Sequence, residues 1–485
     1  MANKTNRRDF IKTGALAASS FMIVPRHVLG KGFIAPSDKL NLASIGAGGK
    51  GWGDIKNAWN DGAENVVALC DVDTGQCKEA LKKWPKAKYY ADFREMLENQ
   101  KDIDAVTISA PDHIHGVAAM TAMQLGKHVY VQKPLTHNIY ETRMLTEAAR
   151  KYKMVTQMGN QGASNPGQQQ MIEWFKAGLI GDVDTVHVWT DRPVWPQGIP
   201  VPTEKMALPE TMTKENWDLF IGPASYVDYH PLYHPFKWRG WWNFGTGALG
   251  DMGCHLIDPP FRVLELGYPT EVECSVGQKF IQDWVPEYIP EGCPPASHVQ
   301  VKFPKSAVNN KDVTMIWSDG GIRPFHPDLI PADHALGEAD SSNGVLMIGD
   351  KGVMTCGTYG RTPKVYLKNG DMLEMPKDYS TANPNEKMSE FGHQKSWTDA
   401  CKAGFGSKEH KALTSSFDYS GPLTETVLMG NLAIRSYQQG TGEGRNRKFE
   451  GRKKLLWDGD AMKVTNYDPA NEFVGRKYRD GWKLI

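Results

Sequence analysis

Leu40-Asn41-Leu42-Ala43-Ser44-Ile45-Gly46-Ala47-Gly48-Gly49-Lys50-Gly51 is the stretch of sequence that decides the fold. Its first half is an apolar run of strand length, and its second half matches the pattern G-x-G-x-x-G. A second apolar run follows at 66–70 and ends at Asp71, which lies 20 residues after Gly51. A strand, a glycine-rich turn, a helix and an acidic residue at the end of the next strand are typical of a dinucleotide-binding βαβ unit.

The same pattern predicts which residues bind the dinucleotide. Glycines let the backbone approach a pyrophosphate, and the N-terminus of the helix that follows supplies N–H donors. An acidic side chain accepts hydrogen bonds from ribose hydroxyls and repels a 2′-phosphate, which favours NAD over NADP. The alternative, a glycine-rich turn without a ligand, leaves these neighbours unexplained. We therefore expect NAD to be bound by Gly46, Gly48, Gly49, Gly51 and Asp71.

Strand-length and helix-length segments alternate through the rest of the first domain. Alternation of this kind gives a parallel sheet with helices on both faces. The sequence therefore predicts an α/β Rossmann domain with a doubly wound parallel sheet over residues 36–158. The strand-length runs are 40–45, 66–70, 105–109, 128–131 and 154–158, and the helix-length segments between them include 92–99, 115–125 and 138–152.

Composition limits the possible partners. The chain has 485 residues, of which 40% are hydrophobic and 23% charged, as is typical of a globular protein. Lys and Arg together number 56, as do Asp and Glu, so the basic excess that nucleic acid or an anionic membrane requires is lacking. The seven cysteines form no C-x-x-C motif, and His230 and His234 are each followed by proline, which opposes a shared helix face. We therefore expect no nucleic-acid partner and no metal site.

The N-terminal residues have the character of an export signal. Arg7-Arg8 is a twin-arginine pair, and a short apolar stretch follows at 15–24. This stretch is too short to cross a hydrocarbon core of about 30 Å, and no longer apolar run of spanning length occurs in the sequence. We therefore expect residues 1–35 to be a twin-arginine-type signal, the protein to be exported to the periplasm, and no segment to span the membrane.

Asp251 and His255 are the candidate acid–base pair of the second half. They lie four residues apart at the start of a predicted helix, so they share one helix face. A carboxylate there can orient the imidazole, and an imidazole can take a proton from a hydroxyl group near neutral pH. From spacing alone, an Asp–His pair on a helix surface is the simpler interpretation.

The segment 229–242, which precedes this helix, is aromatic and basic. Aromatic rings stack on the C–H faces of sugars and polar groups bind their hydroxyls, so such a segment is suited to a sugar-pocket wall. A packed loop between two elements explains it equally well. Two further candidates are Asn160, which follows the last strand of the first domain, and Arg192, which follows the strand at 183–189. We therefore expect the substrate to contact residues among Asn160, Arg192, Tyr229, His230, Trp238 and Arg239.

Four motifs together resemble the Gfo/Idh/MocA oxidoreductases, the family of glucose–fructose oxidoreductase and inositol dehydrogenase. They are Gly46–Gly51, the run Pro111-Asp112-His113-Ile114-His115, the pair Lys133-Pro134, and Asp251 with His255. The resemblance implies a second domain, over residues 159–440, of α+β type with an open, mainly antiparallel sheet. Such a sheet often pairs with another subunit, so a homo-oligomer is implied. We expect the remaining residues, 441–485, to pack on the second domain.

The resemblance also implies roles for the site residues. Lys133 would hydrogen-bond the reacting hydroxyl and stabilise its alkoxide character, with Asp251 and His255 beside it as the acid–base pair. One departure is Gln132, where the family commonly has Glu, so Lys133 lacks a neighbouring charge that relatives have. The loop after the third strand would run beneath the nicotinamide. The further cofactor contacts implied are Pro111, His113, His115 and Lys133.

These features favour an NAD-dependent oxidoreductase acting on a sugar or polyol hydroxyl. Outside the cytoplasm no pool of free NAD(H) recycles the cofactor, so an exported enzyme is expected to hold it tightly. The alternative is a redox-neutral glycosidase, which oxidises a sugar hydroxyl, eliminates the aglycone, adds water and reduces the ketone again. A non-catalytic sugar-binding protein is the third possibility, and intact Lys133, Asp251 and His255 argue against it.

Overall fold

The computed structural model describes residues 38–376 and 392–484. The export signal expected at residues 1–35 lies outside this part of the chain. In the ranges described, no helix is long and apolar enough to cross a bilayer.

A six-stranded, fully parallel sheet forms the first domain, with strand order β3-β2-β1-β4-β5-β6. The predicted doubly wound Rossmann sheet is thus confirmed, and the strand missing from the prediction, β3, has only three residues and little apolar pattern. The strands are β1 (Asn41–Ile45), β2 (Asn65–Cys70), β3 (Lys88–Tyr90), β4 (Ala105–Ile108), β5 (His128–Val131) and β6 (Thr156–Met158). The helices between them are α3 (Gly49–Trp59), α4 (Lys78–Lys83), α5 (Phe93–Asn99), α6 (Asp112–Gln124) and α7 (Ile139–Tyr152).

The carboxyl edge of this sheet carries the predicted nucleotide-binding turn. The strand order reverses between β1 and β4, and in doubly wound sheets a crevice opens at such a switch point. Gly46–Gly51 follows β1 directly, and the loop before α6 follows β4. Both segments therefore meet at the place where a dinucleotide binds in this architecture.

A ten-stranded sheet forms the second domain, with strand order β16-β15-β14-β13-β7-β12-β11-β8-β17-β18. Only β7 and β12 run parallel, so the predicted open, mainly antiparallel sheet is confirmed. A separate hairpin is formed by β9 (Phe280–Gln282) and β10 (Val285–Pro286). The sheet strands are β7 (Val183–Trp189), β8 (Glu271–Val276), β11 (Ser297–Phe303), β12 (Val313–Ser318), β13 (Gly344–Gly349), β14 (Gly352–Cys356), β15 (Lys364–Leu367), β16 (Met372–Glu374), β17 (Leu455–Asp458) and β18 (Lys463–Val464).

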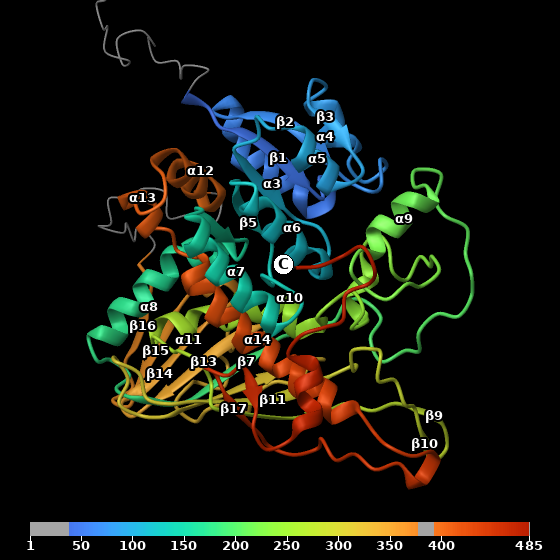
Figure 1. Ribbon diagram of the computed structural model, residues 1–485. Helices are drawn as coiled ribbons and strands as arrows, with labels where there is room; N and C mark the ends of the chain where they lie inside the picture. Colours follow the sequence, from blue (N-terminus) through green and yellow to red (C-terminus); the bar gives the residue numbers. More distant parts are fainter. Residues whose placement is uncertain (1–37, 377–391, 485) are drawn as a thin grey trace, which may run out of the picture. The chain divides into compact units, whose positions relative to one another are not determined.

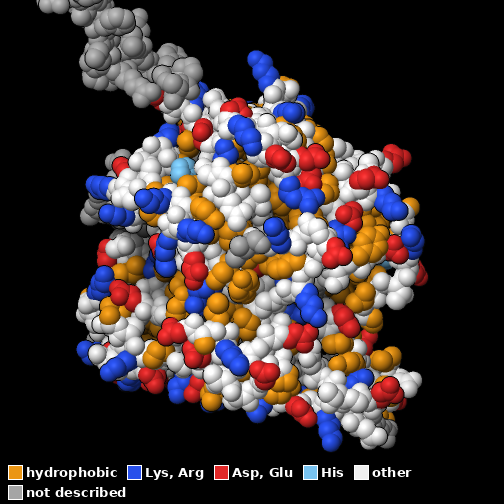
Figure 2. Space-filling view, viewed as in Figure 1, with side chains coloured by type: hydrophobic (Ala, Val, Ile, Leu, Met, Phe, Trp, Pro, Cys, Tyr) orange, Lys and Arg blue, Asp and Glu red, His pale blue; other side chains and the backbone are white. Residues whose placement is uncertain are grey.

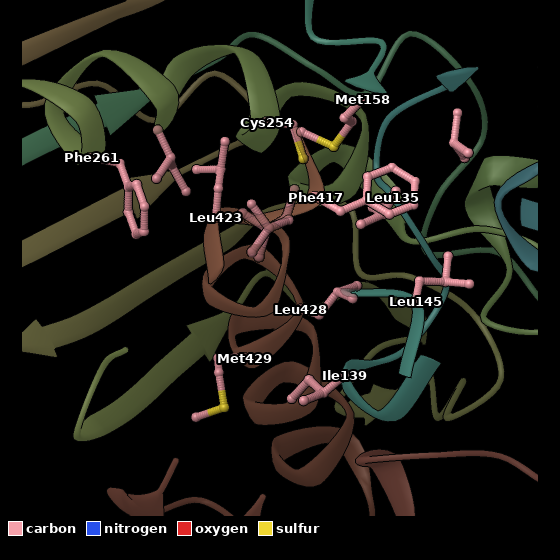
Figure 3. Packing of buried hydrophobic residues seen from close by; sticks show 14 of the residues in the cluster. Leu135, Ile139, Leu145, Met158, Cys254, Phe261, Phe417, Leu423, Leu428 and Met429 are labelled. Atoms are coloured by element: carbon pink, nitrogen blue, oxygen red, sulfur yellow. The ribbon is translucent and has the colours of Figure 1, made fainter. Parts of the chain in front are cut away.

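One long helix, α14 (Phe417–Gln438), joins the two domains. It contacts α7 of the first domain and strands β8 and β11 of the second, and it is apolar on several sides because it is buried between them. Figure 3 shows Leu428 of α14 close to Ile139 of α7. In Figure 1, α14 lies with other helices above the large sheet. The remaining α-helices of the described residues are α8 (Pro166–Lys176), α9 (Lys214–Ile221), α10 (Gly247–Leu256), α11 (Asp258–Val263), α12 (His393–Ala403) and α13 (Lys408–Lys411).

Helix α12 lies within the predicted range of the second domain, 159–440. It contacts α3 of the first domain. Trp397 and Cys401 of α12 are buried in one apolar cluster with Ile55 and Ala58 of α3. The first domain therefore recruits a helix from much later in the chain to cover one face of its sheet.

Residues 441–485, expected to pack on the second domain, contact both domains in the structure. Strand β17 pairs with β8 of the large sheet. Farther along, Arg476 Nε and Tyr478 Oη each donate to Oε1 of Glu141 in α7 at 2.8 Å. The last part of the chain therefore also contacts the first domain, where it meets a buried carboxylate.

Candidate active site

A cavity of about 500 Å³ opens at the carboxyl edge of the parallel sheet, between the two domains. Its first-domain wall follows the ends of β1 to β5, and much of its second-domain wall comes from the segment 234–255. Most residues predicted for cofactor and substrate line it. They are Gly46, Gly48, Gly49, Asp71, Pro111, His115, Lys133, Arg192, Trp238, Arg239, Asp251 and His255.

The glycine turn has the shape that a pyrophosphate requires. Gly46 has a φ of +75°, and a Cβ on it would lie 2.7 Å from the backbone nitrogen of Ala110. A Cβ on Gly51 would lie 1.8 Å from the carbonyl oxygen of Gly46, so only glycine lets the turn close. Gly49 has a φ of +51° and open space beside it, and it begins α3, whose first N–H groups have no partner within the helix. The turn therefore suits a dinucleotide.

Asp71 fixes this turn as well as lining the cavity. Its carboxylate accepts hydrogen bonds from the backbone N–H of Gly48 at 3.0 Å and of Asp73 at 3.1 Å. Burial raises the pKa of Asp71 to about 6, although these two backbone bonds act in the opposite direction. Asp71 therefore holds the glycine turn in place and begins to take up a proton just below neutral pH.

We expect NAD affinity to depend on the charge of Asp71. Below its pKa of about 6 the side chain carries a proton, so it accepts fewer hydrogen bonds from ribose hydroxyls. Affinity should therefore fall as pH is lowered from about 7 to about 5, whereas Asp71→Asn should bind weakly with little pH dependence in that range. Asp71→Ala should weaken binding by about 1–3 kcal/mol. Titration of NAD by calorimetry at several pH values checks this prediction. An Asp71→Asn protein whose NAD affinity depends on pH as strongly as that of the wild type would contradict it.

Lys133 and Asp251 form the ion pair at the centre of the cavity. Lys133 follows β5, and its Nζ donates to Asp251 Oδ1 at 2.8 Å and to the Asp251 carbonyl oxygen at 2.7 Å. Nε of Arg239 lies 3.4 Å from the same Oδ1. Burial alone would raise the pKa of Asp251, but the charges of Lys133 and Arg239 outweigh burial and lower it to about 2. The carboxylate is therefore ionised and orients the lysine.

The structure shows no hydrogen bond between Asp251 and His255. Both residues project from α10 into the cavity, and the Asp251 carboxylate contacts Lys133 and Arg239. Nδ1 of His255 is buried and has no hydrogen-bond partner among the described residues. Burial, and next the charge of Lys133, lowers the pKa of His255 well below its ordinary value, so the ring is a neutral imidazole at neutral pH. It packs edge-on against the ring of Tyr359 at 4.6 Å.

The two histidines after β4 differ in role. His113 is fully buried and outside the cavity, with Nε2 2.7 Å from the Phe220 carbonyl oxygen and Nδ1 3.2 Å from that of Phe244. The ring of His113 therefore connects α6 to the second domain and does not line the cavity. His115 does line the cavity, and its ring nitrogens lie 2.7 and 2.8 Å from the carbonyl oxygens of Ala110 and Pro134.

Three residues predicted to contact substrate lie outside this cavity. Nδ2 of Asn160 donates to Asp258 at 3.2 Å in a buried network. The Tyr229 ring packs edge-on against Trp217, and His230 Nδ1 accepts the N–H of Leu232 at 3.1 Å. The structure does not bring these three side chains into the cavity, and each makes the local contacts given above.

Other cavity residues carried no signal in the sequence. Tyr359 comes from the short 3₁₀ segment Thr358–Gly360 after β14, and Gln161 Nε2 donates to its hydroxyl at 3.3 Å. His234, read from the sequence as part of a loop, lies 3.6 Å from Asp73. Such residues come from loops whose positions follow only from the tertiary fold. The unpredicted lining residues include Lys50, His234, Phe236, Tyr359 and Trp482.

Gln132 has its own partner in the structure. Its Nε2 donates at 2.8 Å to Oδ2 of Asp54, a fully buried carboxylate of α3. Ser109 Oγ and Gln394 Nε2 also donate to Asp54, at 2.9 and 3.0 Å. A glutamate at 132 would place a second carboxylate against Asp54, which is unfavourable in a buried site. The amide at this position therefore belongs to the Asp54 network, and its side chain does not bond the Lys133 ammonium.

The described residues include no group of three His, Cys, Asp or Glu side chains placed to hold a metal ion. Acidic and basic side chains are interspersed over the face of the molecule shown in Figure 2. This agrees with their equal numbers in the sequence.

Comparison with known proteins finds a family match within each domain. Residues 40–160 match the family described as "Oxidoreductase family, NAD-binding Rossmann fold". Residues 193–283 match "Oxidoreductase family, C-terminal alpha/beta domain". The first domain is thus an NAD-binding Rossmann domain.

Similar curated proteins belong to two functional groups. A glycosyl hydrolase family 109 protein of Shewanella pealeana is 28% identical over 205 residues, covering 37% of this chain and 44% of that protein. An α-N-acetylgalactosaminidase of Shewanella oneidensis is 29% identical over 206 residues, with the same coverage. An inositol 2-dehydrogenase of Salmonella typhimurium is 32% identical over 124 residues, covering 25% and 37%. This chain therefore spans less than half the length of each of these relatives.

A solved structure shares the fold over most of its length. The inositol dehydrogenase homologue of Azotobacter vinelandii, complexed with NADH and myo-inositol, superposes with a TM-score of 0.55 at 14% identity. The match covers 86% of this chain and 98% of that one. It shows that the two-domain architecture is common to both proteins.

Proposed function

Because this chain belongs to the Gfo/Idh/MocA oxidoreductase family, we propose that it is an NAD-dependent enzyme acting on a hydroxyl group of a sugar or polyol. The observation that carries the proposal is the meeting of Lys133 and His255 in the cavity that begins at the glycine turn. An ammonium and a neutral imidazole, placed next to a nucleotide-binding turn, are what removal of hydride and proton from an alcohol requires.

The residues of this chain supply the proton chemistry. NAD held by the glycine turn and Asp71 would supply the hydride acceptor. Lys133 donates a hydrogen bond to the hydroxyl oxygen and stabilises the negative charge that develops there. His255 takes the hydroxyl proton, since its low pKa leaves the ring unprotonated. Asp251 orients the Lys133 ammonium by its bond at 2.8 Å.

The second-domain wall supports a carbohydrate as the substrate. Trp238 lines the cavity, and the Arg239 guanidinium lies 4.2 Å from its ring centroid, so an aromatic surface and a hydrogen-bond donor stand together. Arg192 adds a further donor on the same wall. The names of two relatives, an inositol 2-dehydrogenase and an α-N-acetylgalactosaminidase, point to the same class of substrate.

A redox-neutral glycosidase is the second candidate function, in which the same NAD is reduced and reoxidised within one turnover. The family 109 glycosyl hydrolases among the similar proteins favour it. So does the twin-arginine motif at Arg7-Arg8, from which we propose export to the periplasm with the cofactor already bound. Without a pool of free NAD(H), a closed redox cycle is an advantage.

One experiment separates these functions. The purified protein is denatured to release and identify any bound nucleotide, and the native protein is assayed on nitrophenyl glycosides without added cofactor. Glycoside turnover under these conditions supports the glycosidase, whereas NADH formation from free sugars or polyols supports the dehydrogenase. A protein that binds no nicotinamide nucleotide and turns over neither class would contradict both.

We also propose a homo-oligomer that forms through the large sheet. Helices α11 and α14 contact its strands, and several residues of β11 alternate between buried and partly exposed positions. A face of this kind can be covered by a second subunit. Sedimentation of the purified protein is expected to give a mass above 54.0 kDa, and a monomer at micromolar concentration would contradict this.

A further inference from the structure

We propose that residues 476–484 form a strap over the adenosine end of the cofactor cleft, in which Trp482 contacts the adenine ring and slows the release of NAD. The inference rests on the proposed function, because its ligand is NAD. It assigns a cofactor contact to the far end of the chain.

The order of the strands locates the adenosine end. The glycine turn follows β1, at the switch point where the pyrophosphate binds. Asp71 follows β2, and the cavity residues Ala91, Asp92 and Phe93 follow β3. Lys133 follows β5, on the other side of the switch point. The β2–β3 side is therefore the adenosine end, and the β5 side is the reacting end.

The strap is anchored on the first domain by a buried ion pair. Arg476 pairs with Glu141 of α7, with Nη2 to Oε1 at 2.7 Å, and the side chains are 11% and 0% exposed. Nη2 of Arg476 also donates to the carbonyl oxygen of His113 at 2.6 Å. Tyr478 donates to the same carboxylate. Breaking one partner of a buried, hydrogen-bonded pair is costly, so this end of the strap is firmly held.

A second anchor lies on the second domain. Arg479 pairs with Asp218 of α9, and its Nε donates to the carbonyl oxygen of Gly222 at 2.9 Å. Its backbone N–H donates to the carbonyl oxygen of Pro223 at 3.1 Å. In Figure 1 the red end of the chain runs out toward α9 and then turns back toward α6. The strap thus touches both domains on either side of the cleft.

Trp482 is the strap residue that reaches the cavity. Its ring centroid lies 5.9 Å from that of Phe93, and the Arg94 guanidinium lies 4.2 Å from the same ring. Arg94 Nη1 also approaches the carbonyl oxygen of Gly481 at 3.4 Å. Trp482 and Phe93 both line the cavity, so they present an aromatic surface beside Asp71. A purine ring stacks well on such a surface.

The consequence is slow exchange of the cofactor. NAD bound at the glycine turn has Trp482 beside its adenosine half, and the two anchors hold that ring in position. For the dinucleotide to leave, the ring contact must break, and the dissociation rate should reflect its strength. An enzyme that reuses one NAD molecule through many turnovers benefits from this arrangement.

The test measures NAD dissociation directly. The variants are Trp482→Ala, Trp482→Phe and a chain ending at Gly481, with Trp284→Ala as a matched tryptophan control. Trp284 is 83% exposed in the β9–β10 hairpin and does not line the cleft. Each protein is loaded with NAD and chased with isotope-labelled NAD, and the exchange rate and melting temperature are recorded.

Exchange is expected to be roughly 10- to 100-fold faster in Trp482→Ala and in the shortened chain, the range that loss of one stacked base gives. Trp482→Phe should exchange at close to the wild-type rate, as should Trp284→Ala. Unchanged exchange in Trp482→Ala and in the shortened chain would overturn the inference while leaving the proposed function intact. A wild-type protein that binds no NAD would instead overturn the proposed function.

Discussion

Replacing Lys133 by Met is expected to lower kcat at least about 10³-fold while NAD remains bound. The Lys133 ammonium lies 2.8 Å from Asp251 and lines the cavity, so it is the cation placed to meet charge that develops on the substrate oxygen. Methionine has a similar length and no charge, so cavity shape changes little. Single-turnover kinetics with saturating sugar, beside an NAD titration, measure the two effects separately.

A matched control comes from the same domain. Lys127 is partly buried, and its Nζ donates to the carbonyl oxygens of Lys101 and Ile103, away from the cavity. Lys127→Met should therefore affect stability more than kcat. If Lys133→Met instead raises KM with kcat unchanged, Lys133 binds substrate without stabilising the transition state.

The Rossmann sheet and the position of its glycine turn could be predicted because the information is local. A strand, a G-x-G-x-x-G turn and an acidic strand end occupy adjacent stretches of chain, and each imposes a backbone geometry of its own. Gly46 illustrates this: its φ of +75° and the closeness of Ala110 exclude any side chain. Helix α12 lacks such a signal, since nothing in its sequence identifies α3 as the element it covers.

The role of Gln132 could not be predicted for a related reason. Its partner Asp54 lies 78 residues earlier in the chain, and another partner of that carboxylate, Gln394, lies 340 residues after Asp54. From the sequence, Gln132 departs from the glutamate common in the family and removes a charge beside Lys133. In the structure it satisfies a buried carboxylate, which is a requirement set by tertiary packing.

The histidines show the limit of spacing as a guide. His113 and His115 are two residues apart in one helix turn, yet one is fully buried against the second domain and the other lines the cavity. Spacing places Asp251 and His255 on one helix face, and that is correct. It could not show that the two cations Lys133 and Arg239 would compete for the carboxylate.

His255→Ala is expected to lower kcat by about 10²–10⁴-fold, the usual contribution of a general base. Burial and the charge of Lys133 lower the pKa of His255, so the ring loses its proton at a pH below the ordinary histidine range. The wild-type rate should therefore be insensitive to His255 protonation near neutral pH, and should fall only on acidification below that range. NAD affinity should hardly change, because the glycine turn and Asp71 are intact.

His230→Ala is the matched control, since this ring lies outside the cavity and accepts a bond from Leu232. It should keep kcat and KM near wild type. The pH–rate profile distinguishes a base from a packing residue. If His255 is the base, its loss lowers kcat and removes the fall in rate at acidic pH. If His255 only packs against Tyr359, its loss lowers stability and the fall in rate at acidic pH remains. A His255→Ala enzyme with full kcat would transfer the assignment to His115, the other histidine beside Lys133. Both of its ring nitrogens already face carbonyl oxygens, so that outcome would require His115 to give up one of these contacts during turnover.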